Sequence, residues 1–351
     1  MPLEIQDYDA EEERHRHNVG YTEYAAYSTK TFDDFRFPTR LMDDDQLFRF
    51  VDWYNEQDLR RLEPGLFFRD AALETNYTFD EVELLSRISR AVLALTGRYC
   101  KKRVGVYFNH QGSIGLFRVV QAIADITQLK KLSVFEVGPG CGYAGSLIGL
   151  AGHAYTSYDV TQGYYIWQSR LFEELFGEDF TEFASTPNTN FKNITRLAHI
   201  PWWLYMTLYK EMPVRADVVI SNSNLGEMNV DSLRYMLRAS DLMMRDSKVG
   251  LLLFASPGAH NINSQVKIEM ELKAAGFSRV LSEKIFGFIP RNKEVPVEVV
   301  EALEANIPLY DPSGLGKTFS IREFIDFESA EMADEFYFNA FLHDWPSLAG
   351  D

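Results

Sequence analysis

The 351-residue sequence predicts an α/β fold built on a doubly wound, mostly parallel sheet. From Ser133 onward, short apolar runs alternate with amphipathic segments of helical spacing, which is the pattern of βαβ units. A glycine-rich turn follows the first of these runs, and such strand-to-helix turns are where doubly wound sheets bind ligands. Before Ser133 the apolar residues recur at helical spacing instead. We therefore expect a sheet domain that follows a helical region.

The region before the sheet is predicted to be largely helical. Between Asp43 and about Leu129, apolar residues recur every three or four positions, which places them on one face of a helix. The three series are Leu47, Phe50, Val51 and Tyr54, then Val82, Leu85, Ile88 and Val92, and then Ile114, Phe117, Val120 and Ile123. We assign residues 1–111 to a helical N-terminal region that caps the sheet domain or supplies dimer contacts.

The sheet domain is assigned to residues 112–290. Its expected strands are the apolar runs 134–137, 154–160, 180–184, 217–221, 249–255 and 279–285. Its expected helices run from the glycine turn through Gly149 and then over about 164–176, 230–245 and 264–275. The stretch between 185 and 216 is predicted to be irregular. Residues 291–351 form a C-terminal extension, rich in aromatic residues, that we expect to pack on the domain.

Charge and composition exclude several classes of partner. The net charge is −16 and the pI about 4.9, so the field around the protein repels phosphate backbones and argues against nucleic acid. No apolar stretch approaches the roughly 20 residues that span a bilayer, and no signal-peptide pattern is present. The two cysteines, Cys100 and Cys141, indicate no disulfide framework. We expect a cytoplasmic protein, bound to no membrane, that acts on a small molecule and can form a homodimer.

The glycine-rich turn carries the first functional prediction. The residues Phe135-Glu136-Val137-Gly138-Pro139-Gly140-Cys141-Gly142 lead from a buried strand into a helix. Glycines there allow a tight turn and a close approach of the backbone to a ligand, and the helix presents free N–H groups. The overlapping pattern Gly140-x-Gly142-x-x-Gly145 also matches the dinucleotide-binding fingerprint. Two kinds of cofactor therefore compete for this turn.

Two carboxylates help to distinguish these cofactors. Glu136 ends the strand two residues before the first glycine, where a negative charge disfavours a pyrophosphate. The same charge favours a cationic ligand such as S-adenosylmethionine, which carries a sulfonium and an ammonium group. Asp159 ends the next strand, where its two oxygens can accept both hydroxyls of a ribose. Alternatively, Asp159 is a turn or helix-capping aspartate.

In these features the chain resembles the class I S-adenosylmethionine-dependent methyltransferases. The shared pattern is E-x-G-x-G-x-G after the first strand, an acidic residue after the second, and the order of the elements that follow. The resemblance covers about residues 112–290 and implies a Rossmann-like sheet, S-adenosylmethionine as cofactor and S-adenosylhomocysteine as product. It places five residues at the cofactor, namely Glu136, Gly138, Gly140, Gly142 and Asp159. We also expect Asn222, which follows a later strand, to contact the cofactor.

A second, shorter resemblance concerns the methyl acceptor. The segment Asn224-Leu225-Gly226-Glu227-Met228, taken with the aromatic segment 158–165, is similar to a group of sugar O-methyltransferases. This similarity implies transfer of a methyl group to a hydroxyl of a small molecule, such as a sugar or a glycosylated natural product. Many small-molecule members carry Leu-x-His at this point, whereas this chain has Leu225-Gly226-Glu227, so a histidine base is not expected there.

The candidate catalytic residues follow from the needs of a hydroxyl acceptor, which benefits from a base that removes its proton. Glu227 is the first candidate, followed by His110 and His199. Glu227 alternatively caps the helix that begins near Val230 or binds the acceptor, and His110 alternatively caps the helix near Gly112. The acidic residues form no compelling trio of hard oxygen ligands, so we expect no metal.

Two other functions stay open at this point. One is an NAD(P)-dependent oxidoreductase that uses Gly140-x-Gly142-x-x-Gly145 as its phosphate-binding turn. The other is a methyltransferase-like partner subunit that keeps the fold without turnover.

Overall fold

The structure of the chain is a computed structural model. It describes residues 2–16, 40–51, 76–99, 111–185, 191, 196–211, 213–222, 224–254, 263–281, 286–290, 297, 300–302 and 319–320.

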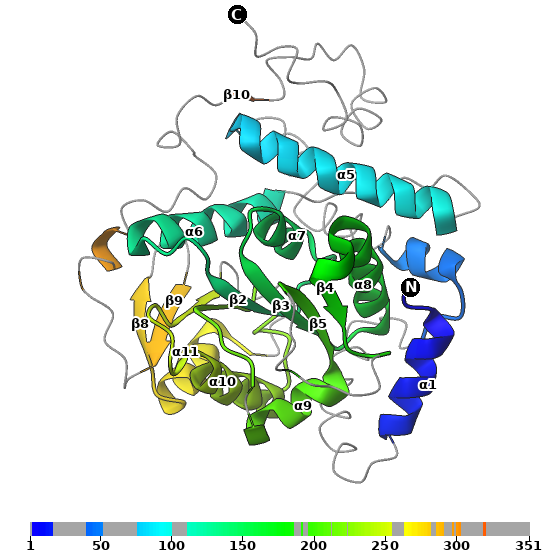
Figure 1. The fold of residues 1–351 in the computed structure, drawn as a ribbon. Helices are drawn as coiled ribbons and strands as arrows, with labels where there is room; N and C mark the ends of the chain where they lie inside the picture. Colours follow the sequence, from blue (N-terminus) through cyan, green and yellow to red (C-terminus); the bar gives the residue numbers. More distant parts are fainter. Residues whose placement is uncertain are drawn as a thin grey trace, which may run out of the picture.

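The centre of the molecule is an eight-stranded sheet with the strand order β4-β5-β3-β2-β6-β7-β9-β8 (Figure 1). Its strands are β2 (Ser133–Val137), β3 (Ala154–Asp159), β4 (Phe180–Glu182), β5 (Leu197–Pro201), β6 (Val218–Ile220), β7 (Leu251–Phe254), β8 (Phe277–Leu281) and β9 (Phe286–Pro290). Neighbouring strands from β4 to β7 run parallel, whereas β9 runs antiparallel to both β7 and β8. The predicted doubly wound, mostly parallel sheet is therefore confirmed.

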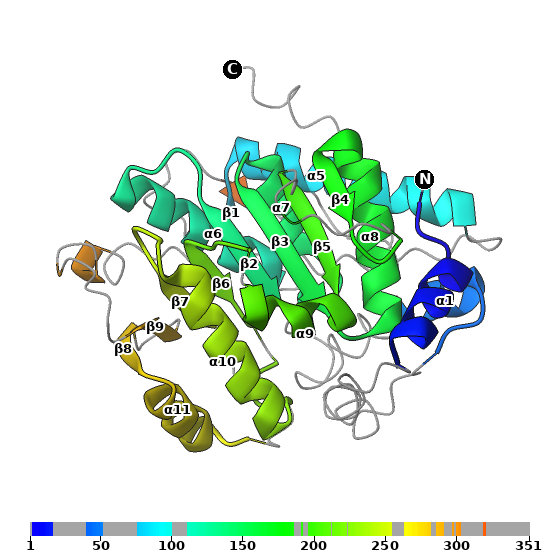
Figure 2. The same cartoon turned by 60° about the horizontal axis from the view of Figure 1, so that its bottom comes forward.

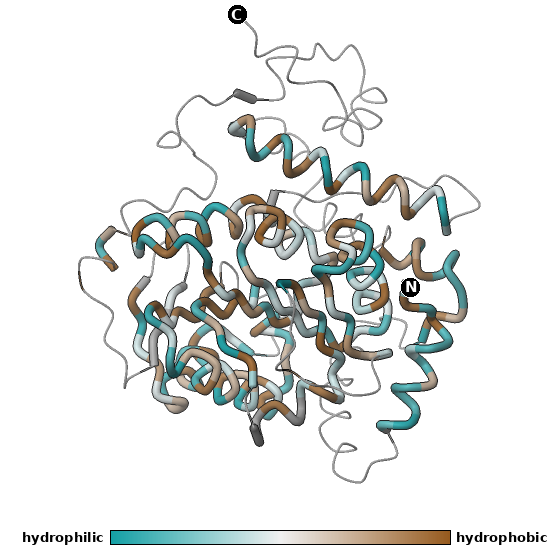
Figure 3. Tube along the Cα trace, in the orientation of Figure 1, coloured by the Kyte–Doolittle hydropathy of each residue, from teal (hydrophilic) through white to brown (hydrophobic). Residues whose placement is uncertain are grey.

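Helices cover both faces of this sheet (Figures 1 and 2). One face carries α6 (Gln111–Thr127), α7 (Tyr143–Leu150) and α8 (Gln162–Phe176). The other carries α9 (Trp202–Glu211), α10 (Val230–Met244) and α11 (Gln265–Ala274). Hydrophobic residues gather along the central strands and the helix sides turned toward them (Figure 3). A parallel sheet needs both faces covered, which explains why its strands are buried almost throughout.

The N-terminal helices form a further layer outside α6, α7 and α8. Helix α5 (Phe79–Tyr99) lies against α7 and α8, and α1 (Ile5–Arg16) lies against α8. Residues 44–51 are also helical, as the apolar spacing predicts. The buried residues of this layer belong to the same hydrophobic core as the sheet. The boundaries at 111 and 290 stay a prediction.

Three local expectations were incomplete or wrong. The stretch between 185 and 216 is not wholly irregular, because it contains β5 and α9. Strand β5 has only five residues, with a histidine in its middle and a proline at its end, so its sequence lacks an apolar run although every residue in it is buried. The single strand expected at 279–285 is replaced by the hairpin of β8 and β9. Helix α1 lies in the region predicted to be helical, but the apolar spacing did not locate it, because its sequence is strongly polar.

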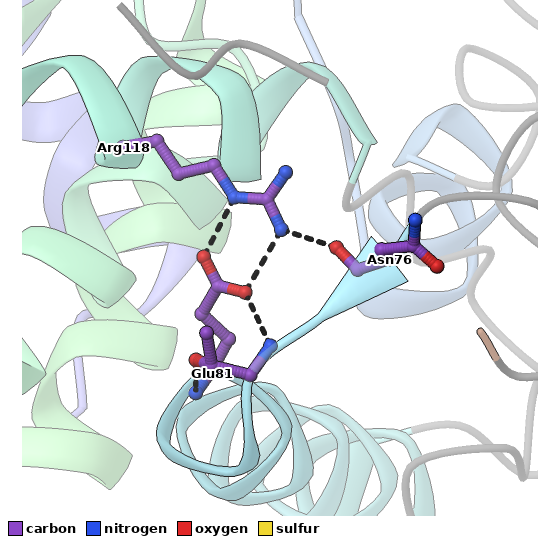
Figure 4. A network of polar contacts seen from close by, with 4 residues as sticks. Asn76, Glu81 and Arg118 are labelled. Atoms are coloured by element: carbon purple, nitrogen blue, oxygen red, sulfur yellow. Dashed lines mark hydrogen bonds and ion pairs between the residues drawn. The ribbon is translucent and has the colours of Figure 1, made fainter. Parts of the chain in front are cut away.

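A buried ion pair joins α5 to α6 (Figure 4). Arg118 of α6 donates from Nε to Glu81 Oε1 at 2.6 Å and from Nη2 to Glu81 Oε2 at 2.8 Å. The same Nη2 donates to the carbonyl of Asn76 at 2.6 Å. Glu81 also accepts from the backbone N–H of Thr78, whose hydroxyl accepts from the Glu81 N–H, so the pair is built into a capping box at the start of α5. Asn76 belongs to β1 (Asn76–Tyr77), which pairs with β10 (Phe319–Ser320) of the C-terminal extension.

The N-terminal region also reaches the first turn of α8. Gln162 accepts a hydrogen bond from the Leu41 backbone N–H at 2.6 Å and donates one to Asp9 of α1. Farther along α8, the buried Arg170 donates to the Leu3 carbonyl and to Asp44. These contacts hold the N-terminal region beside the turn that follows β3.

Candidate ligand-binding site at the carboxyl edge of the sheet

The turn between β2 and α7 has the backbone of a glycine turn rather than an ordinary loop. Gly138, Gly140 and Gly142 have φ angles of 67°, 59° and 74°. Residues other than glycine rarely adopt this left-handed backbone conformation. A Cβ atom added to Gly138 would collide with the Asn224 amide, whereas one added to Gly140 would meet open space. The turn is therefore packed at its first glycine and open at its second.

Neutral side chains and backbone groups hold this turn in place. The Gly138 N–H donates to the Tyr158 carbonyl of β3 at 2.9 Å. Gln168 of α8 donates from Nε2 to the Gly140 carbonyl at 2.6 Å. Asn224 donates from Nδ2 to the carbonyls of Val137 and Gly138. Carbonyl groups of the turn therefore already accept hydrogen bonds from the protein's own side chains. A ligand would instead contact the backbone of the left-handed segment.

Glu136 is a buried carboxylate at the end of β2, with 3% of its surface exposed. It accepts a hydrogen bond of 2.7 Å from the Tyr155 hydroxyl of β3. Burial raises the pKa of Glu136 to about 7, the Tyr155 hydrogen bond opposes this rise, and the Asp159 carboxylate adds to it. Gly145 of α7 packs on the Tyr155 ring, where a Cβ atom would not fit. The third glycine of the G-x-G-x-x-G pattern therefore serves helix–strand packing here.

Asp159 lies at the end of β3 on the same side of the sheet as Glu136. In the parallel register Glu136 is opposite Ser157, and side chains two residues apart on a strand share a face. Asp159 Oδ1 accepts from the Thr161 backbone N–H at 2.8 Å, which is the predicted turn role, while Oδ2 lies 3.4 Å from Gln168 Nε2. Burial raises the pKa of Asp159 to about 7, against the hydrogen bonds from Thr161 and Gln168. One oxygen thus fixes the turn and the other is only weakly engaged by Gln168.

The loop between β6 and α10, residues 221–229, lies next to the glycine turn because β6 pairs with β2. Asn222 and Glu227 are both half-buried in this loop. The backbone N–H of Glu227 donates to the Asn224 carbonyl at 3.1 Å. Asn229, not Glu227, caps α10, because its side chain accepts from the Asp231 N–H. The capping alternative for Glu227 is thereby excluded.

Of the two candidate histidines, His199 belongs to the described residues and His110 does not. His199 lies in the interior of β5 with no exposed surface. Its Nδ1 is 3.0 Å from the Ser169 hydroxyl, and its ring stacks on Tyr165 at 3.9 Å. Burial lowers the pKa of His199 well below the usual value. His199 therefore has the surroundings of a core histidine, and His110 lies outside the described residues.

Sequence reasoning missed Gln168 and Tyr155, which both support the site. The signal for Gln168 is a polar residue on a helix side that is otherwise aromatic and aliphatic, since Tyr165, Leu171 and Phe172 of α8 are fully buried. Tyr155 carries no comparable signal, because a tyrosine in a buried strand is ordinary core.

Two further classes of feature were sought in the described part of the chain. Among its residues there is no group of three or more His, Cys, Asp or Glu side chains that could hold a metal ion. None of its helices is long and apolar enough to cross a membrane.

Comparisons with known proteins return structures but no sequence relatives. No protein-family profile and no curated protein matches the chain. A TehB-like SAM-dependent methyltransferase from Corynebacterium glutamicum matches with a TM-score of 0.36 and 13% identity, covering 50% of this chain and 87% of that one. The magnesium protoporphyrin IX methyltransferase of Synechocystis PCC 6803 matches with a TM-score of 0.35 and 13% identity, covering 71% and 98%. An SAH-bound methyltransferase of Podospora anserina matches with a TM-score of 0.35 and 11% identity, covering 74% and 100%. These values describe a distant likeness, and the fold of this chain is defined by its own strand order.

The burial of Glu136 makes a prediction about stability. Its pKa is raised in the folded protein from 4.5 to about 7, so the folded state binds more protons than the unfolded state between these values and stability falls as pH rises through them. Glu136→Gln removes the buried charge and keeps an acceptor for Tyr155. At pH 8 the ligand-free variant should be more stable than the parent by up to about 3 kcal/mol in urea unfolding, with the difference shrinking toward pH 5. Equal stability of variant and parent at pH 8 would contradict the conclusion that burying the charged Glu136 destabilises the folded protein. The matched control is Glu178→Gln, because Glu178 is exposed.

Proposed function

We propose that the chain is an S-adenosylmethionine-dependent methyltransferase that methylates a hydroxyl of a small molecule. The observation that carries the proposal is the pair of buried carboxylates, Glu136 and Asp159, at the ends of adjacent strands beside an open glycine turn. Both carboxylates have pKa values raised to about 7, so both gain from a ligand that supplies positive charge or hydrogen-bond donors. A ligand with an ammonium group and a ribose supplies both.

The dinucleotide alternative is less well supported by the same residues. A pyrophosphate at this turn would meet the carboxylate of Glu136 without a countercharge in the turn's known contacts, which come from the amides of Gln168 and Asn224. The sheet also departs from the all-parallel order of a dinucleotide-binding domain, because antiparallel β9 is inserted between β7 and β8.

The residues fit an S-adenosylmethionine molecule by their chemistry. Glu136 would hold its ammonium group, Asp159 would accept from its ribose hydroxyls, and the backbone at Gly140 would lie along it. When bound, this cofactor supplies a methyl group attached to a positively charged sulfur. The protein's own contribution is to orient the two reactants and to exclude water, which is where most of the acceleration of such a transfer arises.

On the acceptor side, Glu227 is the residue that we propose as general base. It lies half-buried in the β6–α10 loop beside the glycine turn, where a carboxylate can reach an acceptor bound next to the cofactor. His110, just before α6, is the second candidate. The buried surroundings of His199 do not support a role in contact with the acceptor. A sugar or a glycosylated natural product is the proposed acceptor class, on the strength of the Asn224–Met228 resemblance.

Calorimetry tests the cofactor assignment directly. The parent protein should bind S-adenosylhomocysteine with micromolar or tighter affinity and should not bind NAD under the same conditions. Gly140→Val should abolish this binding, because it fills the open space at the turn. Gly177→Val is the matched control, since Gly177 has a similar φ of 52° and equally open surroundings after α8. Asp159→Asn should weaken binding about 10- to 100-fold by removing a charge-assisted hydrogen bond. Tight NAD binding, or unchanged affinity in Gly140→Val, would overturn the assignment.

Turnover tests Glu227. With labelled S-adenosylmethionine and a panel of glycosides, Glu227→Gln should lower kcat by about 10²- to 10⁴-fold and leave S-adenosylhomocysteine affinity intact if it is the base. A raised KM at unchanged kcat would instead make Glu227 an acceptor-binding residue. Parental values of both constants would remove it from the site and direct attention to His110. A parent protein that binds the cofactor but methylates nothing in a broad panel would favour the non-catalytic partner subunit.

A further inference from the structure

The β6–α10 loop is tied to the protein from two sides by asparagine side chains. On the side of the glycine turn, Asn224 donates from Nδ2 to the carbonyls of Val137 and Gly138, the second at 3.3 Å. Its Oδ1 accepts from the Ser221 hydroxyl, so both ends of the amide are engaged. The contact is close, because a Cβ atom on Gly138 would strike this amide.

On the opposite side, Asn263 holds the same loop from the segment before α11. Its Nδ2 donates to the Leu225 carbonyl at 3.3 Å and to the Met228 carbonyl at 2.6 Å. Its backbone N–H donates to the Gly226 carbonyl at 2.9 Å. Asn263 has only 1% of its surface exposed, so these hydrogen bonds are shielded from water. Asn263 therefore fixes three backbone carbonyls of the loop, which precede and follow Glu227 in the sequence.

The loop's internal hydrogen bonds connect these two attachments. The backbone N–H groups of Glu227 and Met228 both donate to the Asn224 carbonyl at 3.1 Å. Asn224 thus bonds to the glycine turn through its side chain and to the Glu227 segment through its backbone. The single residue Asn224 therefore links Gly138 to Glu227 through two successive hydrogen bonds.

We propose that Asn224 and Asn263 are positioning residues that together form a two-sided clamp on the β6–α10 loop. Asn224 couples the glycine turn to the loop, and Asn263 holds the loop's far side without touching the turn. Resting on the proposed function, this arrangement makes cofactor binding at the turn order the segment that carries Glu227. Because such coupling is reciprocal, loosening the loop at Asn224 must weaken cofactor binding, whereas loosening it at Asn263 leaves the attachment to the turn intact and weakens binding less.

The same substitution at three asparagines separates these roles. Asn224→Asp and Asn263→Asp keep the size of the side chain but replace amide donors with a carboxylate that faces carbonyl oxygens. Asn229→Asp is the matched control, because Asn229 only caps α10 and aspartate caps as well as asparagine. The two readouts are S-adenosylhomocysteine affinity by calorimetry and hydrogen exchange of residues 224–229 and of the glycine turn.

Asn224→Asp should weaken S-adenosylhomocysteine binding by at least about tenfold, the size expected when a buried hydrogen-bonding group loses its partner. It should also speed exchange in both the loop and the glycine turn. Asn263→Asp should speed exchange in the loop alone and change affinity by less than about threefold, and Asn229→Asp should change neither by more than about twofold. In the parent, S-adenosylhomocysteine should slow exchange at Glu227 and Met228, and Asn224→Asp should abolish this slowing.

Parental affinity in Asn224→Asp, or bound S-adenosylhomocysteine that leaves loop exchange unchanged in the parent, would overturn the coupling. If the parent binds no S-adenosylhomocysteine, the proposed function fails instead, and exchange without ligand still decides whether Asn224 joins loop and turn. Should Asn224→Asp fail to fold, Asn224→Ala provides the same test, because it removes the amide that joins the loop to the turn without placing a charge opposite the carbonyls.

Discussion

The constraint on which the site depends is the burial of two carboxylates side by side. Glu136 and Asp159 end adjacent parallel strands and face the same helices, with about 3% of each exposed. An ionised carboxylate loses its hydration when it is buried, and this burial raises the pKa values of both groups to about 7. The nearby Asp159 carboxylate adds to the rise at Glu136. The hydrogen bonds from Tyr155 and Thr161 offset only part of this cost. The protein therefore keeps, at the carboxyl edge of its sheet, a site that a cationic ligand with hydroxyl donors stabilises.

The rest of the fold holds this edge in place. Parallel strands bring their carboxyl ends together, so the turn after β2, the turn after β3 and the β6–α10 loop become neighbours. Gln168 of α8 joins the Gly140 carbonyl to the Asp159 side of the site. The N-terminal layer then braces α8 through Gln162 and Arg170, and the Arg118–Glu81 pair locks α5 onto α6. Removing one partner of a buried pair such as Arg118–Glu81 typically costs about 3 to 5 kcal/mol, because the other charge is left buried without a countercharge.

Sequence patterns predicted the elements whose burial is regular and missed those whose burial is not. Strands β2 and β7 contain apolar runs, β3 carries two tyrosines, and all three are buried almost throughout. Gly138, Gly140 and Asp159 occupy positions that the backbone of a doubly wound sheet makes recognisable. Strand β5 was missed because a histidine and a proline interrupt its pattern, although neighbouring strands on both sides bury it. The support from Tyr155, Gln168 and Asn263 depends on contacts between residues far apart in the chain, which no local spacing encodes. The role of Glu227 stays a proposal, because its loop position is known but its acceptor is not.

The most direct test of the buried-carboxylate account is the number of protons released when S-adenosylhomocysteine binds. At pH 6.5 both carboxyl groups, with pKa values of about 7, are largely protonated in the free protein, and the ligand's ammonium group and ribose hydroxyls favour their charged forms. Calorimetric titrations in two buffers with different ionisation enthalpies measure this release. A net release of protons is expected, and it should shrink in Glu136→Gln and in Asp159→Asn. Binding with no proton release, or with uptake, would contradict it.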